Sequence, residues 1–274
     1  MRAEPRDNAT TPRPETREVH ALLVAAGRGE RLGGDRPKGR VLLAGRPLFV
    51  YALRTLLGHP CRADVCLLVP SEEAEVRAAG EILTEHVDPA GRERVRIRAG
   101  GARRQDTVRA GLLDLQERGA SPDSVVVVHD AARPLLSAAL LTRCLDALDE
   151  SLPSRGQSEL PGLEPGDGPR RLPSAAIPGL PVRETLKLVF EERVVLTQPR
   201  ENLWSVQTPQ VFRFGPILQA HRRALRLGLS ATDDAALLEW QGMPVRLVPG
   251  DPGNLKVTVA EDLALAERLL ELAR

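Results

Sequence analysis

The chain has 274 residues, 42% apolar and 27% charged, so it can bury a sizeable core and has the composition of an ordinary globular protein. Its formal net charge of +1 provides no long-range field that would attract nucleic acid or an anionic membrane, so local clusters of cations must hold any anionic ligand. It contains no run of about 18 apolar residues, so we expect no membrane-spanning segment.

Residues 1–17 lack the apolar core of a secretion signal and are expected to form a disordered tail before one domain at 18–274. The chain has three cysteines, an odd number, and no secretion signal. Reduced thiols are the default in that setting, and so few cysteines are too little for a zinc site. We therefore expect a cytoplasmic protein.

Predicted strands and helices alternate along the first half of the domain. Apolar runs predict strands at 18–25, 64–69 and 125–128, and alternating polar and apolar residues predict another at 94–98. Helical spacing predicts helices at 46–57 and 104–118, and Ser71 is expected to cap another helix between them. The all-valine run 125–128 is typical of a strand that is covered on both faces. This alternation predicts βαβ units and a mostly parallel sheet, which is the α/β fold class.

The pattern changes at 151–172, where eight of 22 residues are Gly or Pro and no periodicity is visible, so we predict a flexible insertion. Residues 182–196 are rich in β-branched side chains around a turn-like Glu191-Glu192-Arg193, which predicts a hairpin. The remaining elements are expected to be helices at 214–227, 232–240 and 260–272 and a strand at 245–248.

A glycine-rich segment directly follows the first predicted strand and leads to Pro37-Lys38. Glycines there let backbone amides approach phosphate oxygens, and Arg31 and Lys38 add two cations. A plain surface loop would explain the glycines but not the cations. A Walker A loop would need Gly-Lys-Ser/Thr, and a dinucleotide fold would need an acidic residue closing a second strand, where this sequence predicts a helix. We therefore predict binding of nucleotide phosphates.

A second polar cluster, His129 to Pro134, lies at the carboxyl end of the valine strand, where α/β sheets bind ligands. Asp130 is suited to a hydroxyl or a metal and Arg133 to a phosphate. A local Asp–Arg ion pair that only shapes the turn is the alternative.

A third candidate is Lys256, which lies between the last predicted strand and helix. Only three of the 38 basic residues are lysine, Lys38, Lys187 and Lys256. That scarcity favours a ligand role for a compact ammonium group, although a solvated surface lysine is the simpler alternative. Thr208-Pro209-Gln210 and Thr232-Asp233-Asp234 are expected to begin helices as caps.

Taken together and in order, these segments resemble the 2-C-methyl-D-erythritol 4-phosphate cytidylyltransferase family of the non-mevalonate isoprenoid pathway. The matching segments are AAGRGER from Ala25, PK at Pro37, GGARRQDTV from Gly100, HDAARP from His129, PVRETLK from Pro181, LWSVQTPQ from Leu203, TDDA from Thr232 and NLKVT from Asn254. The chain departs from the family pattern at Gly39, Arg40 and Ala102, and the insertion lengthens a connection that is usually short.

The resemblance implies a Rossmann-like nucleotidyltransferase with a mostly parallel central sheet, helices on both faces and a protruding β-arm at about 182–205 that joins two subunits into a homodimer. It also implies transfer of CMP from CTP to 2-C-methyl-D-erythritol 4-phosphate, with release of pyrophosphate. Mg²⁺ is the expected cofactor, held mainly by the phosphates.

The resemblance further assigns roles to individual residues. The catalytic cations would be Arg31, Lys38 and Lys256. The residues expected to bind CTP are Ala25, Ala26, Gly27, Gly29, Gly101, Arg104, Thr107 and Ala131. The residues expected to bind the acceptor are Asp130, Arg133, Thr208 and Thr232, together with Thr185 and Arg200, which would reach the neighbouring subunit's site from the arm.

Three alternatives stay open at the level of sequence. A cytidylyltransferase of the same fold could act on ribitol 5-phosphate instead. The chain could be an inactive relative that only binds nucleotide, although the retained cations argue against this. A dehydrogenase is disfavoured by the missing ribose-binding acid.

Overall fold

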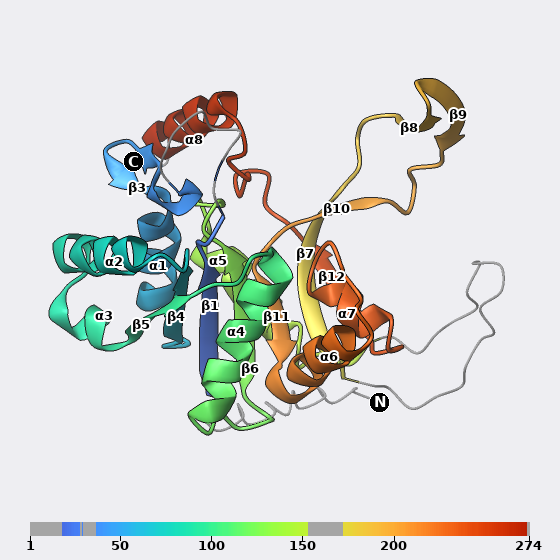
Figure 1. Cartoon of the computed structure of the whole chain (residues 1–274). Helices are drawn as coiled ribbons and strands as arrows, with labels where there is room; N and C mark the ends of the chain where they lie inside the picture. Colours follow the sequence, from blue (N-terminus) through green and yellow to red (C-terminus); the bar gives the residue numbers. More distant parts are fainter. Residues whose placement is uncertain (1–17, 28, 30–36, 153–171, 273–274) are drawn as a thin grey trace, which may run out of the picture.

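A central sheet organises the part of the chain that the computed structural model describes, which is residues 18–27, 29, 37–152 and 172–272. The predicted tail at 1–17, most of the predicted insertion at 151–172 and Arg31 lie outside the described residues. Eight strands form the sheet in the order β10-β7-β11-β6-β1-β4-β5, with β12 paired to β7 (Figure 1).

Four neighbouring strands form a parallel half of the sheet. They are β6 (Val125–Asp130), β1 (Val19–Val24), β4 (Asp64–Val69) and β5 (Val95–Ala99). The helices that connect them are α1 (Leu48–Gly58), α2 (Glu73–His86), the short α3 (Pro89–Glu93) and α4 (Arg104–Glu117). In the middle of this half, Leu22 lies opposite Cys66 on one side and Val128 on the other. The predicted βαβ units are confirmed.

Helices cover both faces of the sheet, which explains the valine run. Val125 and Val127 belong to one buried cluster, and Val126 and Val128 belong to another. The first cluster includes side chains of α1, α2 and α5 (Ala138–Asp146), and the second includes side chains of α4, α6 (Phe214–Arg226) and α7 (Ala235–Glu239). All four valines are fully buried because neither face of β6 meets solvent.

The other half of the sheet contains strands that the sequence analysis mostly missed. They are β7 (Ala175–Pro181), β10 (Trp204–Val206), β11 (Gln210–Arg213) and β12 (Val245–Pro249). Of these, only β12 was expected. Strand β7 contains Pro178 and Gly179, which are unfavourable inside a strand, but it pairs with β10, β11 and β12. The β11 strand runs antiparallel to β6 and so joins the two halves.

The predicted hairpin is confirmed and forms the arm. Strands β8 (Leu186–Phe190) and β9 (Arg193–Gln198) pair with each other, and the turn places Glu191 and Glu192 at positive φ, 43° and 63°. Every residue of both strands is exposed. Figure 1 shows the hairpin well away from the sheet.

Several predicted boundaries were wrong at caps and short strands. Ser71 does not cap α2, whose N-cap is Glu72. The helix expected from residue 46 begins at Leu48, because β3 (Arg46–Pro47) pairs with β2 (Leu42–Leu43). The segment Thr208-Pro209-Gln210 leads into β11 and not into a helix, and its Thr208–Pro209 peptide is cis. Helix α8 (Ala260–Leu272) follows its prediction, and no helix in the described ranges is long and apolar enough to cross a membrane.

Two helical glycines provide a matched test of this packing. A Cβ added at Gly111 in α4 would lie 2.8 Å from Cδ2 of the fully buried Leu22, whereas one added at Gly80 in α2 meets its nearest atom at 3.9 Å. We expect Gly80→Ala to raise the free energy of unfolding by about 0.5–1 kcal/mol, through helix propensity. Gly111→Ala should lower the free energy of unfolding, because overpacking costs about 1–3 kcal/mol and outweighs the gain in helix propensity. Urea unfolding measures both, and equal stabilisation by the two changes would contradict this packing of α4.

Candidate active site

A cavity of about 940 Å³ lies at the carboxyl ends of the four parallel strands. The chain runs from β1 to β4 and β5 on one side and returns to β6 on the other side, so this end of β1 is a topological switch point. Its size suits a small-molecule ligand. The lining includes Val24 to Gly27 at the end of β1, Pro70 to Glu72 after β4, Gly100 to Arg104 after β5, Asp130 to Ala132 at the end of β6, and Gly29, Lys38, Gly39, Thr107, Lys256 and Thr258.

The segment after β1 forms one wall of the cavity. The Lys38 backbone N–H donates to the Gly27 carbonyl at 2.9 Å and brings the short helix η2 (Lys38–Arg40) against this segment. Gly39 is buried here, and a Cβ on it would lie 3.0 Å from that of Ala25. Glycine at this departure from the family pattern therefore fits a close approach of two backbones.

Arg40, which also departs from the family pattern, links the same wall of the cavity to α2. Its Nη1 donates to both carboxylate oxygens of Glu75, at 2.9 and 3.0 Å. The Pro70 to Glu72 segment, which leads into α2, also lines the cavity. Sequence analysis missed this lining, although its position directly after a predicted parallel strand was a usable signal.

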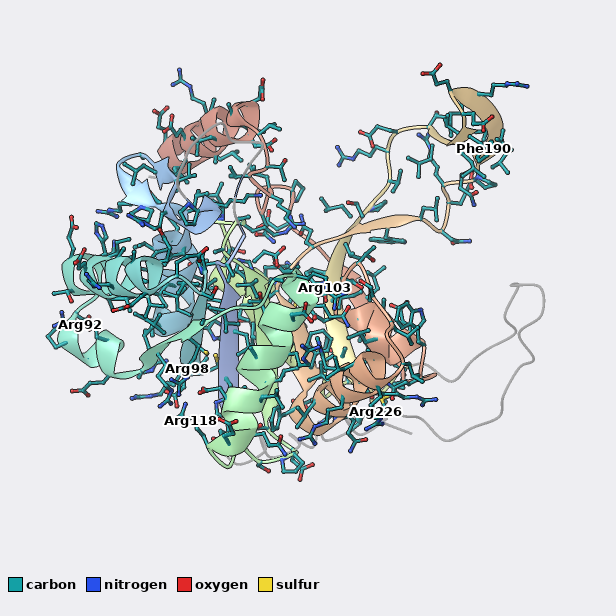
Figure 2. All side chains as sticks on the ribbon, in the orientation of Figure 1. Arg92, Arg98, Arg103, Arg118, Phe190 and Arg226 are labelled. Carbon is teal, nitrogen blue, oxygen red and sulfur yellow. The ribbon has the colours of Figure 1, made fainter. Side chains whose placement is uncertain are left out.

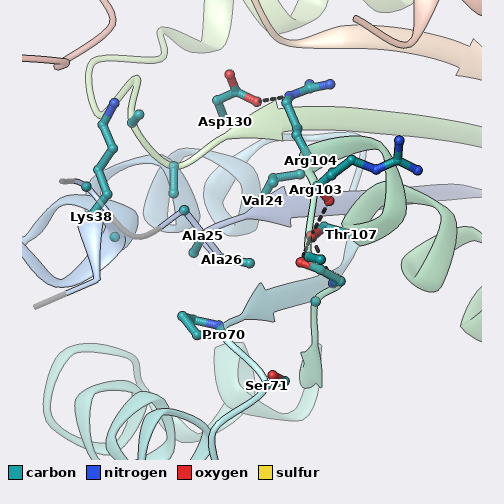
Figure 3. A pocket seen from close by; sticks show the side chains of 18 of the residues that line it. Val24, Ala25, Ala26, Lys38, Pro70, Ser71, Arg103, Arg104, Thr107 and Asp130 are labelled. Carbon is teal, nitrogen blue, oxygen red and sulfur yellow. Dashed lines mark hydrogen bonds and ion pairs between the residues drawn. The ribbon is translucent and has the colours of Figure 1, made fainter. Parts of the chain in front are cut away.

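The turn between β5 and α4 forms the opposite wall. Gly100 is required there, because a Cβ would lie 2.7 Å from the Cβ of Ala26. The Thr107 hydroxyl accepts from the Gly101 N–H at 3.0 Å and lies 3.1 Å from the Arg103 carbonyl, to which it can donate. Thr107 therefore stabilises this turn. Figure 3 shows Lys38 and Arg104 on opposite sides of the cavity.

Asp130 connects three separate parts of the chain at the cavity. Its Oδ1 accepts from Arg104 Nε at 2.9 Å, and its Oδ2 accepts from Lys256 Nζ at 2.8 Å. Arg104 Nη1 also donates to Oδ2 of Asp234 at 2.7 Å, and Asp234 Oδ1 lies 3.1 Å from Nε2 of His221. The carboxylate of Asp130 thus pairs with two cations that are distant in the sequence. The alternative from the sequence analysis was a local ion pair with Arg133.

These contacts determine the charges at neutral pH. Burial alone would raise the pKa of Asp130, but Arg104 and Lys256 outweigh it and hold that pKa well below its usual range. Burial would likewise raise the pKa of Asp234, and Arg104 and His221 reverse the direction. Burial would lower the pKa of Arg104, but the two carboxylates raise it above the ordinary value. Two carboxylates and a guanidinium therefore remain ionised in a confined space.

Arg133 and Thr208 do not line the cavity but support it. Arg133 Nη1 donates to the Asn254 carbonyl at 2.7 Å, and Thr208 Oγ1 accepts from the Asp130 backbone N–H at 3.1 Å. His129 lies between them, with Nε2 3.0 Å from the Arg133 carbonyl and Nδ1 3.2 Å from Thr208 Oγ1. Burial lowers the pKa of His129 to about 4, so the ring is neutral at neutral pH.

Three other predicted residues lie away from the cavity lining. Thr185 and Arg200 are exposed at the base of the arm, where Arg200 donates to the Arg183 carbonyl. Thr232 is exposed in the loop before α7. Within this one chain, the structure thus brings the predicted nucleotide residues together with Asp130 and Lys256, but leaves the two arm residues apart from them.

Comparison with known proteins gives consistent matches. The family model of IspD, 2-C-methyl-D-erythritol 4-phosphate cytidylyltransferase, matches residues 19–155 and 170–272. The enzyme of that name from Halorhodospira halophila is 40% identical over 255 residues, which are 93% of this chain and 94% of that enzyme. The crystal structure of the Thermus thermophilus enzyme of that name is 31% identical, with a TM-score of 0.67 over 93% of this chain and 99% of that one.

Longer relatives match as well. The bifunctional enzyme IspD/IspF from Mesorhizobium japonicum is 37% identical over 93% of this chain, and the chain spans 56% of that enzyme. In the family match, the break between residues 155 and 170 falls within the predicted insertion. The strands and motifs that form the cavity lie inside the matched ranges. The chain therefore belongs to the IspD family, the 2-C-methyl-D-erythritol 4-phosphate cytidylyltransferases.

Proposed function

We propose that this chain transfers CMP from CTP to 2-C-methyl-D-erythritol 4-phosphate and releases pyrophosphate. The observation that carries the proposal is the meeting of Lys38, Arg104 and Lys256 around one cavity at a topological switch point. Cations from separate segments suit a reaction between two polyanions, and the family membership supports this pair of substrates. We also propose a cytoplasmic location, which the three free cysteines support.

The nucleotide would lie along the two walls made of glycine-rich turns. Backbone groups at Ala25 to Gly27, with Lys38, would face the triphosphate, where the absence of bulky side chains permits close contact. Gly101 and Thr107, on the opposite wall, would lie on the cytidine side, near Ala131. Arg31 lies outside the described residues and is proposed to add a further cation to the triphosphate.

The acceptor would bind near Asp130 and Lys256 and supply the nucleophile itself. An oxygen of its phosphate attacks the α-phosphorus of CTP, a P–O bond forms there, and the bond to the departing pyrophosphate breaks. Lys38 and Lys256 would stabilise the charge that accumulates around the α-phosphorus, at positions fixed before the substrates bind.

Magnesium is proposed as the cofactor, held mainly by phosphate oxygens and water. The described residues contain no group of three His, Cys, Asp or Glu side chains that could hold a metal ion. Both oxygens of Asp130 already accept from cations. Such a site suits Mg²⁺, which binds through substrate phosphates and keeps several waters. When bound, Mg²⁺ neutralises part of the triphosphate charge.

A homodimer through the arm is proposed because the arm is apolar and unsupported. Leu188, Val189, Phe190, Val194 and Val195 are each more than half exposed. An isolated two-stranded hairpin is marginally stable in water, and an exposed apolar patch marks an interaction surface. A second copy would cover the arm and receive Thr185 and Arg200 at its acceptor site.

Loss of either cavity lysine tests the proposed chemistry. We expect Lys38→Ala and Lys256→Ala each to lower kcat on the order of 10²-fold or more, since each removes a preorganised cation. Pyrophosphate release with CTP, Mg²⁺ and methylerythritol phosphate measures this, and ribitol 5-phosphate and UTP serve as parallel substrates. Arg77→Ala removes an exposed cation of α2 and is the control. Full activity in the lysine variants would contradict the proposal.

Disrupting the arm tests the dimer. Phe190, the most exposed apolar side chain of the arm at 69%, becomes charged in Phe190→Lys (Figure 2). We expect monomers in analytical ultracentrifugation where the unaltered protein is dimeric, together with a loss of turnover because the acceptor site lacks the arm. Leu225→Lys, at a position of α6 that is 55% exposed, should change neither. A dimer that survives Phe190→Lys would exclude the arm as the interface.

A further inference from the structure

Beyond the cavity lining, the ion pair of Asp130 continues into the buried interior between α4, α6 and α7. We propose that Asp234, supported by His221, is a positioning residue that holds the Arg104 guanidinium and, through Asp130, the ammonium of Lys256. The inference rests on the proposed cytidylyl transfer, because it assigns a role to residues behind the same site. Figure 3 shows Arg104 joined to Asp130 at the cavity.

Asp234 and His221 act from outside the reach of a ligand. Their side chains are 1% and 0% exposed, and neither lines the cavity. A buried carboxylate that touches no ligand can influence turnover only through the groups that it holds. Asp234 holds one group that faces the cavity, Arg104, at 2.7 Å, while its other oxygen faces His221 at 3.1 Å.

The two carboxylates fix the orientation of Arg104. Asp130 accepts from Nε and Asp234 accepts from Nη1, so the planar guanidinium is anchored at two different nitrogens. With one anchor removed, the guanidinium can rotate about the remaining contact. Its contact with Asp130, which also holds Lys256, would then shift.

The loop that carries Asp234 is itself fastened to α4 next to Arg104. The buried Gln105 donates through Nε2 to the Leu229 carbonyl at 3.1 Å and accepts through Oε1 from the Ala231 N–H at 3.0 Å. Two successive residues of α4 thus hold the same loop. Asp233, by contrast, accepts from the Ala236 N–H and from Gln210, whereas Arg104 donates to Asp130 and Asp234.

Asp233 therefore provides a matched control. We expect Asp234→Asn to lower kcat by about tenfold or more, because a misplaced cation weakens the transition state more than the bound substrates. The KM for CTP should stay within about twofold, and Asp233→Asn should change neither constant beyond that range. His221→Leu keeps the Asp234 charge and removes only its support, so it should lower kcat in the same way by a smaller factor.

A double-mutant cycle separates positioning from a general loss of structure. If Asp234 acts through Arg104, adding Asp234→Asn to an Arg104→Gln variant should cause no further loss of kcat. If Asp234→Asn lowered kcat by the same factor in the unaltered protein and in Arg104→Gln, or left kcat of the unaltered protein unchanged, the inference would be overturned. Neither result would affect the proposed function. Should Asp234→Asn fail to fold, unchanged kcat in His221→Leu would overturn it. Absence of turnover in the unaltered protein would instead overturn the proposed function, and the inference with it.

Discussion

The carboxylate of Asp130 is the point on which the site depends. It lies at the end of a strand that is buried on both faces, and its two oxygens hold Arg104 from α4 and Lys256 from the segment before α8. Arg104 and Lys256 are thereby fixed beside a cavity before any anion enters it. A charge that is already oriented stabilises a transition state without reorganisation at the moment of reaction, which water cannot do. The same two contacts also join segments that are far apart in the chain.

Much of the fold could be predicted because its pattern is local. Three of the four parallel strands are apolar runs, the fourth, β5, alternates, and helical periodicity separates the strands. The valine run of β6 directly reflects helices on both faces. Strand β7 could not be predicted in this way, since Pro178 and Gly179 oppose a strand and the pairing that stabilises it involves three strands from other parts of the chain. The predicted helix cap at Ser71 was wrong because this residue faces the cavity instead of the first turn of α2.

The residues of the site likewise divide into those that a local sequence pattern predicts and those that depend on distant contacts. The carboxyl ends of parallel strands meet at one edge, so a sequence that places Gly27 and Asp130 just after apolar runs predicts that they converge. The link from Arg104 to Asp234 spans 130 residues and depends on how α4 packs against α6 and α6 against α7, which no local pattern indicates. The acidic pair before α7 was predicted as a cap, and only its first member, Asp233, accepts from the helix backbone.

The proposed reaction requires an oxygen of the acceptor's own phosphate to attack the α-phosphorus of CTP. Methylerythritol phosphate labelled with a heavy oxygen isotope in its phosphate group tests this directly, with the product analysed by phosphorus NMR. We expect the oxygen that bridges the two phosphorus atoms of the product to carry the label and the released pyrophosphate to carry none. An unlabelled bridging oxygen, or label in the pyrophosphate, would contradict it.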